Sequence, residues 1–200
     1  GNLLSNNRIG KLSLVRFAGK MYKVIINSVS EQGYQVSYGP IDATTAENIL
    51  IPVDSNYNFV YLHFQNGIVT DVEPPKQDWD FVLTYYQFVY YTETPYLPYQ
   101  VVGALLNPYH TTGAADSTET IEFDNYHLEQ AEQLSFVPNR DIIGFDWKTA
   151  NINTLTYTVK TKHIFFVQTQ DGSLWKMHFT NFHNDKGERG SPQFAYQRLK

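Results

Sequence analysis

Apolar and polar residues alternate most regularly near the C-terminus, where residues 157–199 are predicted to form an antiparallel meander of three strands. Asp171-Gly172 separates the first run, residues 157–167, from the second, and Asp-Gly between two alternating runs is a strong hairpin signal. A charged loop at residues 184–190 separates the second run from the third, residues 193–198.

The second run of the meander has two distinct faces, because successive side chains of a strand point to opposite sides. Trp175, Met177 and Phe179 share one face, which is predicted to be core. Lys176 and His178 share the other face, and His178 is predicted to be an exposed strand histidine.

Shorter alternating runs predict strands in the first half of the chain. They lie at residues 12–17, 21–29, 33–38, 58–64 and 68–72. Ala18-Gly19-Lys20 and Gln65-Asn66-Gly67 are predicted hairpin turns, the second through its Asn-Gly pair. Residues 41–48 fit a loop or a single helical turn, and the pattern does not separate the two.

The middle of the chain holds its longest extended run, residues 79–91, which contains no Gly or Pro and is apolar on both faces. It predicts a central strand. Further strands are predicted at residues 99–106 and 142–147. The polar segment 107–120 is predicted to be a loop, and Asn125 is predicted to cap a short helix at residues 126–134.

Together these runs predict an all-β fold, in which residues 1–200 form a single domain of mostly antiparallel strands and hairpins with at most one or two short helices. Residues 1–10 are expected to be a flexible N-terminal segment. Aromatic residues make up 16% of the chain and charged residues only 18%, which favours strands, because aromatic side chains suit a half-buried pleated surface.

Charge and cysteine content exclude several classes of protein. The net charge is −5 and Lys and Arg are scattered, so the basic footprint of a nucleic-acid-binding protein is missing. The chain has no cysteine, which excludes disulfides, zinc–thiolate sites and thiol nucleophiles. No apolar run approaches the roughly 18 residues of a transmembrane helix, so no transmembrane segment is predicted.

Six histidines are the first candidates for chemistry, but none forms an i, i+4 pair or an HExxH motif. His63 and His163 lie in strand-like runs among large apolar neighbours, and are predicted to be structural. His110 and His127 lie in or beside the polar segment, where side chains are free to reach a ligand; solvated loop residues are the alternative.

Other motifs give no support for an enzyme. Acidic pairs such as Asp78/Asp80 share a strand face instead of opposing each other across a cleft, and no nucleophile-elbow or phosphate-binding motif occurs. The tyrosine-rich run at residues 85–91, with Tyr96 and Tyr99, must point alternate rings outward, so some of these tyrosines are predicted to line a groove or to contact a partner.

Three segments of the chain resemble the HmuY-like haem-binding proteins of Bacteroidetes. They are residues 58–86, which contain Asp78-Trp79-Asp80, residues 140–160, and residues 165–199 with their Asp-Gly turn and Asn-Asp-Lys-Gly loop. The resemblance implies an all-β exported lipoprotein, held at the outer membrane or released as a haemophore. Its signal and lipid-bearing cysteine would lie upstream of this sequence.

The resemblance also implies that haem is held between finger-like strand pairs by two axial side chains and passed to an outer-membrane receptor. The neighbourhood of the second axial ligand is residues 145–148 here, which offers no His or Met. The first lies between the strand at residue 99 and Arg140. The residues available there as haem-binding or iron-ligating candidates are His127, His110, Tyr126 and Tyr109.

The sequence therefore predicts a non-enzymatic haem- or porphyrin-binding exported protein for haem-iron acquisition, with haem as its cofactor. The alternative is an HmuY-like paralogue that has lost haem ligation and serves as a surface interaction module for a protein or glycan. The missing His or Met at residues 145–148 favours this alternative.

Overall fold

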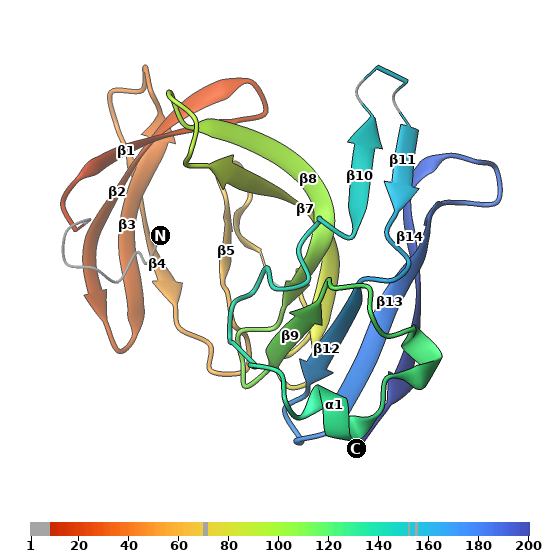
Figure 1. The fold of residues 1–200 in the computed structure, drawn as a ribbon. Coiled ribbons are helices and arrows are strands. Elements are labelled where there is room, and N and C mark those ends of the chain that lie inside the picture. The colour runs from red at the N-terminus through yellow and green to blue at the C-terminus, as the bar shows by residue number, and fades with distance from the viewer. Residues whose placement is uncertain (1–8, 70–71, 152, 155) are drawn as a thin grey trace. The chain divides into compact units, whose positions relative to one another are not determined.

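The computed structural model describes residues 9–69, 72–151, 153–154 and 156–200 (Figure 1). Its residue contacts gather into two compact units, Gly1–Lys76 and Gln77–Lys200. The grouping of residues 1–200 into a single domain stays a prediction. Of the predicted flexible segment, residues 1–8 lie outside the described part of the chain.

The first unit consists of a four-stranded antiparallel sheet and a short hairpin. Its strands are β1 (Leu12–Phe17), β2 (Lys20–Ser30), β3 (Gly33–Pro40), β4 (Glu47–Pro52), β5 (Tyr61–His63) and β6 (Gly67–Val69). The sheet has the order β1-β2-β3-β4, and β5 pairs with β6 around the predicted Asn-Gly turn. The pattern did not predict β4, whose apolar run is only Ile49-Leu50-Ile51.

Aromatic rings form the centre of the first unit. Tyr22 of β2 and Tyr38 of β3 are both buried, and each packs against Phe64 next to the hairpin. The rings of Tyr22 and Phe64 are stacked with centroids 4.5 Å apart. The short hairpin therefore covers the four-stranded sheet through one aromatic side chain.

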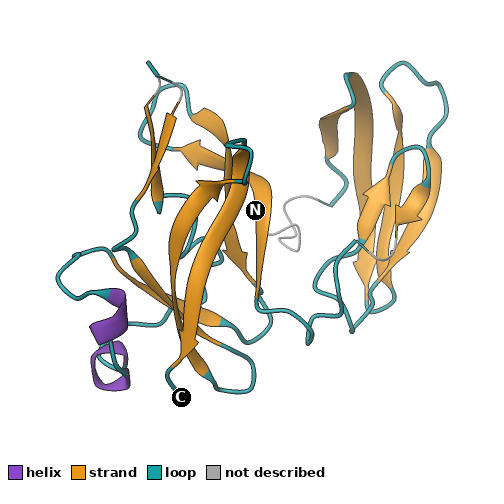
Figure 2. Cartoon of the chain, turned by 90° about the vertical axis from the view of Figure 1, so that its right-hand side faces the viewer, coloured by secondary structure: helices purple, strands orange, loops and turns teal. Residues whose placement is uncertain are grey.

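Within its described residues, the second unit holds eight strands and two short helical turns, and strands dominate it as Figure 2 shows. The strands are β7 (Phe81–Tyr90), β8 (Leu97–Leu106), β9 (Thr112–Asp116), β10 (Lys148–Asn151), β11 (Thr156–Val159), β12 (Ile164–Gln168), β13 (Leu174–His183) and β14 (Arg189–Arg198). The helical turns are η1 (Phe123–Asn125) and α1 (Leu128–Ala131). One sheet has the order β14-β13-β12-β9, while β7-β8 and β10-β11 are two-stranded hairpins. The all-β fold is confirmed.

The predicted C-terminal meander is confirmed as β12, β13 and β14. Its first strand is shorter than expected, because a turn at residues 160–163 separates β11 from β12. All four residues from Ile164 to Val167 are buried. Phe165 and Val167 pack in one core cluster and Ile164 and Phe166 in another, so both faces of this sheet are covered.

Two predictions between β8 and β10 are wrong. Residues 107–120 are not only loop, because β9 pairs with β12 through its small residues Gly113, Ala114 and Ala115. Small side chains give little strand signal. Position 113 favours glycine, because an added Cβ would lie only 2.6 Å from Ile142 Cγ2. The predicted helix is reduced to α1, and its N-cap is His127, not Asn125.

The extended runs at residues 79–91 and 142–147 also differ from the prediction. The first forms β7, but β7 pairs with β8 alone in a two-stranded hairpin, so it is not a central strand. The second is not a strand: only Gly144 forms an isolated bridge, to Ala104 of β8, and its φ of 58° interrupts the extended backbone.

Candidate functional site

A cleft of about 610 Å³ opens within the second unit, lined by both two-stranded hairpins. Tyr85, Tyr90 and Tyr99 come from β7–β8. Tyr157 comes from β11, and Phe182, at the end of β13, is one of the most buried lining residues. The volume falls in the range of about 300–1,000 Å³ that is typical of small-molecule and cofactor sites.

The long β7–β8 hairpin explains why tyrosines reach this cleft. Each strand has ten residues, and successive side chains point to opposite faces. Tyr85 is 67% exposed on one face. Tyr99 pairs directly with Phe88 on the other face, where Tyr99 keeps 45% of its surface exposed and Phe88 packs against Phe145 with centroids 5.1 Å apart. The prediction that some of these tyrosines line a groove is confirmed.

The segment before β10 places two further residues at the cleft, Phe145 and Lys148. Between them, Trp147 is fully buried and stacks on Phe179 with centroids 3.9 Å apart. Its indole N–H donates to the carbonyl of Gly144 at 3.2 Å. Because Trp147 is fixed in the core, its neighbours in the chain are held at the cleft.

Lys148 lies half-buried at the cleft among aromatic rings and carbonyl groups. Its ammonium donates to the carbonyl oxygens of Val102 at 2.5 Å and Phe145 at 3.4 Å, and lies 4.0 Å from the Trp147 ring centroid. Burial lowers the pKa of Lys148 to about 8, and the nearby charge of Asp146 opposes this shift. An ammonium has three N–H donors, so these two hydrogen bonds leave one for a ligand.

Arg189, the first residue of β14, supplies a second cation to the cleft. Its guanidinium carbon lies 5.9 Å from the ring centroid of Tyr157. Among the described residues that line the cleft there is no Asp or Glu, so this lining is positive on a chain whose net charge is −5. The arrangement suits a flat apolar molecule that carries anionic groups.

The structure places His110 and Tyr109 in the turn between β8 and β9. Their rings contact each other edge to face with centroids 4.4 Å apart, and His110 is exposed with a φ of 54°. Neither residue is among those that line the cleft.

The structure places His127 and Tyr126 beside α1, and neither lines the cleft. His127 is exposed, and its backbone N–H donates to the side-chain oxygen of Gln130 at 3.0 Å. Tyr126 is buried against Phe166. Burial, the charge of Asp116 and a hydrogen bond to that carboxylate raise the pKa of Tyr126 to about 12.

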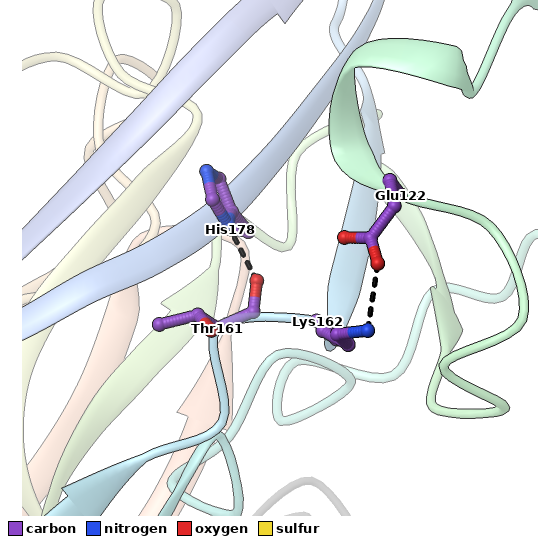
Figure 3. Close-up of polar contacts among 4 residues, drawn as sticks. All are labelled: Glu122, Thr161, Lys162 and His178. Carbon is purple, nitrogen blue, oxygen red and sulfur yellow. Dashed lines mark hydrogen bonds and ion pairs between the residues drawn. The ribbon is translucent and has the colours of Figure 1, made fainter.

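Three of the other histidines have structural partners. His178 Nδ1 lies 2.6 Å from the carbonyl oxygen of Thr161. Figure 3 shows this contact together with the Lys162–Glu122 ion pair. The ring of His178 also stacks on Phe123 and is only partly exposed, so the prediction of an exposed strand histidine is wrong. His63 and His163 are structural as predicted: His63 Nδ1 accepts two backbone N–H groups, and His163 is buried beside Glu119.

Among the described residues, no group of three or more His, Cys, Asp or Glu side chains is placed to hold a metal ion. Within the same residues, no helix has the length and apolar character needed to cross a membrane.

Comparison with known proteins supplies the family. The sequence model described as "HmuY protein" matches residues 55–196. The chain belongs to the HmuY family. The matched range of this HmuY family member includes every residue that lines the cleft.

One solved structure that matches is the crystal structure of the apo HmuY analog of Tannerella forsythia. The two chains are 16% identical, the match covers 70% of this chain and 88% of the other, and the TM-score is 0.31. No curated protein sequence matches the chain.

Sequence reasoning missed two charged residues of the cleft, Lys148 and Arg189. Lys148 lies in the neighbourhood, residues 145–148, that the family resemblance singled out, but only His and Met were considered there. Arg189 lies in a charged loop, and only the pairing of β13 with β14 brings it to the cleft.

Proposed function

We propose that this HmuY family member is a non-enzymatic protein that binds haem or a related porphyrin in the cleft between its two hairpins. One observation carries the proposal: a cleft of about 610 Å³ whose described lining residues combine tyrosine rings with two cations and include no carboxylate. Family membership agrees with it.

The residues that line the cleft complement both the flat macrocycle and the carboxylates of a porphyrin. The flat macrocycle would lie against Tyr90, Tyr99 and Tyr157, since large ring systems gain most from aromatic contact. The carboxylates of the porphyrin would accept charge-assisted hydrogen bonds from Lys148 and Arg189.

Membership of the HmuY family, not the cleft itself, suggests the cellular role. The protein would be exported, would take part in haem-iron acquisition as an outer-membrane lipoprotein or released haemophore, and would deliver its ligand to an outer-membrane receptor.

An axial ligand from His127 or His110, with Tyr126 or Tyr109 beside it, remains a prediction. The residues that line the cleft include no His and no Met, so this lining fits the macrocycle and its carboxylates but offers neither of those iron ligands. The prediction for the histidines and the proposal for the cleft therefore need separate variants.

The test is a haemin titration followed at the Soret band, with one variant that fills the cleft. Ala150 of β10 is exposed and lines the cleft, so Ala150→Trp should weaken binding by about tenfold or more. Thr149→Trp is the matched control, because the side chain at position 149 points away from the cleft, on the opposite face of β10. No saturable shift with the wild-type protein, or equal loss in both variants, would refute the proposal.

His127→Ala and His110→Ala test the axial ligands in the same titration. A changed Soret spectrum would support either histidine as a ligand. An unchanged spectrum with retained binding would remove the histidine assignment and leave the cleft proposal intact.

The alternative function is a surface interaction module without haem. Tyr91 and Tyr96 at the tip of the β7–β8 hairpin favour it, because they are 71% and 65% exposed and lie outside the cleft lining. If this alternative holds, the haemin titration of the wild-type protein will show no saturable shift of the Soret band.

A further inference from the structure

We propose that the cleft recognises the macrocycle and the carboxylates of a tetrapyrrole but not its metal, so that metal-free porphyrin binds as tightly as haemin. This inference rests on the proposed function and defines its ligand class. Three observations support it: the absence of His and Met from the lining, the placement of two cations, and the ring contacts.

Three of the side chains that ligate haem iron, His, Met and Cys, are absent from the described lining of the cleft, while Tyr, a less common ligand, is present there. The chain has no cysteine and only two methionines. Met21 belongs to β2 in the first unit, and Met177 is buried in the core cluster around Trp147.

The histidines are also absent from the lining. His63 belongs to the first unit, and His163 and His178 are held by Glu119 and by the carbonyl of Thr161. His183 comes nearest along the chain, because it follows the cleft residue Phe182. Its ring centroid lies 6.0 Å from that of Phe182, and it is not a lining residue.

The two cations can select carboxylates independently of any metal. Lys148 keeps one N–H donor beyond its two carbonyl contacts, and no ion pair joins Arg189 to a carboxylate of the described residues. An anion beside Lys148 would also stabilise its protonated form, whose pKa burial has lowered to about 8. The propionate groups of a porphyrin provide these anions whether or not iron is present.

The ring contacts are likewise indifferent to iron. Four tyrosines line the cleft, and contact of their rings with the faces or edges of a macrocycle depends on its flat π-system. If those contacts and the two cations supply most of the affinity, removing the metal changes little.

The experiment compares three ligands on the intact protein: haemin, protoporphyrin IX and protoporphyrin IX dimethyl ester. Binding is followed by quenching of tryptophan fluorescence, because Trp147 adjoins the cleft residue Lys148. We expect the dissociation constants of haemin and protoporphyrin IX to agree within about threefold, and the ester to bind about tenfold or more weakly.

Charge variants separate the carboxylate contacts from the ring contacts. Lys148→Met and Arg189→Met should each weaken protoporphyrin IX binding by about three- to tenfold while leaving the ester unchanged. Arg189 is exposed, so its variant keeps the test valid if Lys148→Met fails to fold. Lys186→Met, in the same loop but outside the lining, is the control.

Haemin binding more than about tenfold tighter than protoporphyrin IX would overturn the inference and leave the proposed function standing. Tyr157→Phe and His183→Ala would then identify the iron ligand. Equal binding of diacid and ester would refute the carboxylate contacts. If none of the three ligands binds, the proposed function itself fails together with the inference.

Discussion

Tyr86 and Lys176 each bury a polar group in the second unit, and the two groups differ in whether they find a hydrogen-bond partner among the described residues. Lys176 is only 1% exposed, yet its ammonium donates to the carbonyl oxygens of Phe123 at 2.5 Å and Tyr126 at 2.9 Å. Burial lowers the pKa of Lys176, and the two carbonyls offset part of the cost. The buried hydroxyl of Tyr86 has no hydrogen-bond partner among the described residues.

Removing the Tyr86 hydroxyl should therefore leave stability unchanged or raise it. A buried donor without a partner costs free energy that Tyr86→Phe would recover, while the ring keeps its contact with Phe145. Tyr126→Phe is the control: it removes a hydroxyl that is bonded to Asp116, and should lower the free energy of unfolding by about 1 kcal/mol. Urea denaturation measures both, and a loss of about 1 kcal/mol or more in Tyr86→Phe would contradict the prediction.

At the scale of elements, a close backbone contact holds the segment before β10 against β8. The N–H of Ala104 donates to the carbonyl of Gly144 at 2.8 Å, and the N–H of Gly144 donates back at 3.1 Å. A Cβ on Gly103 would lie 2.4 Å from that same Gly144 oxygen. The contact positions Phe145 and Lys148, which follow Gly144, at the cleft.

Gly103→Ala should consequently destabilise the protein by about 1–3 kcal/mol, because the added methyl group pushes two backbones apart. It should also weaken haemin binding. Gly39→Ala is the control, since its Cβ would come no nearer than 3.4 Å to another atom. The free energy of unfolding of the two variants is measured by far-UV circular dichroism during urea unfolding. A loss in Gly103→Ala no larger than the loss in Gly39→Ala would contradict the prediction.

At the scale of the molecule, the second unit contains what the proposed function requires. Both of its core clusters and all lining residues of the cleft lie within Gln77–Lys200. All three tryptophans of the chain also lie there, so intrinsic tryptophan fluorescence reports on this unit alone.

We expect residues 77–200 to fold without the first unit and to bind haemin with the affinity of the full chain. The measurement is thermal unfolding of both proteins by fluorescence, together with a haemin titration. In the full chain, coincident fluorescence and far-UV transitions would support the single-domain prediction, because far-UV signals report on both units. An unfolded fragment would show that the second unit depends on the first.

Local chemistry explains which elements were predictable. The Asp171-Gly172 and Asn66-Gly67 turns place positive φ at Gly172 and Gly67, and the alternating runs beside them became paired strands. These features depend on neighbouring residues in the chain. The family resemblance, carried by the same segments, was confirmed.

Only tertiary structure decided the rest, because pairing and burial depend on residues far apart in sequence. Nothing within residues 112–116 identifies a strand until β12 pairs with them. From the sequence, Lys176 would be expected at the surface. It is buried because it donates hydrogen bonds to two carbonyl oxygens some fifty residues earlier in the chain. The sequence by itself determined an all-β HmuY family scaffold with outward tyrosines. Only the structure decided that Lys148 and Arg189 share a cleft with these tyrosines. The reason is that three separate strand pairings must form before these side chains come together.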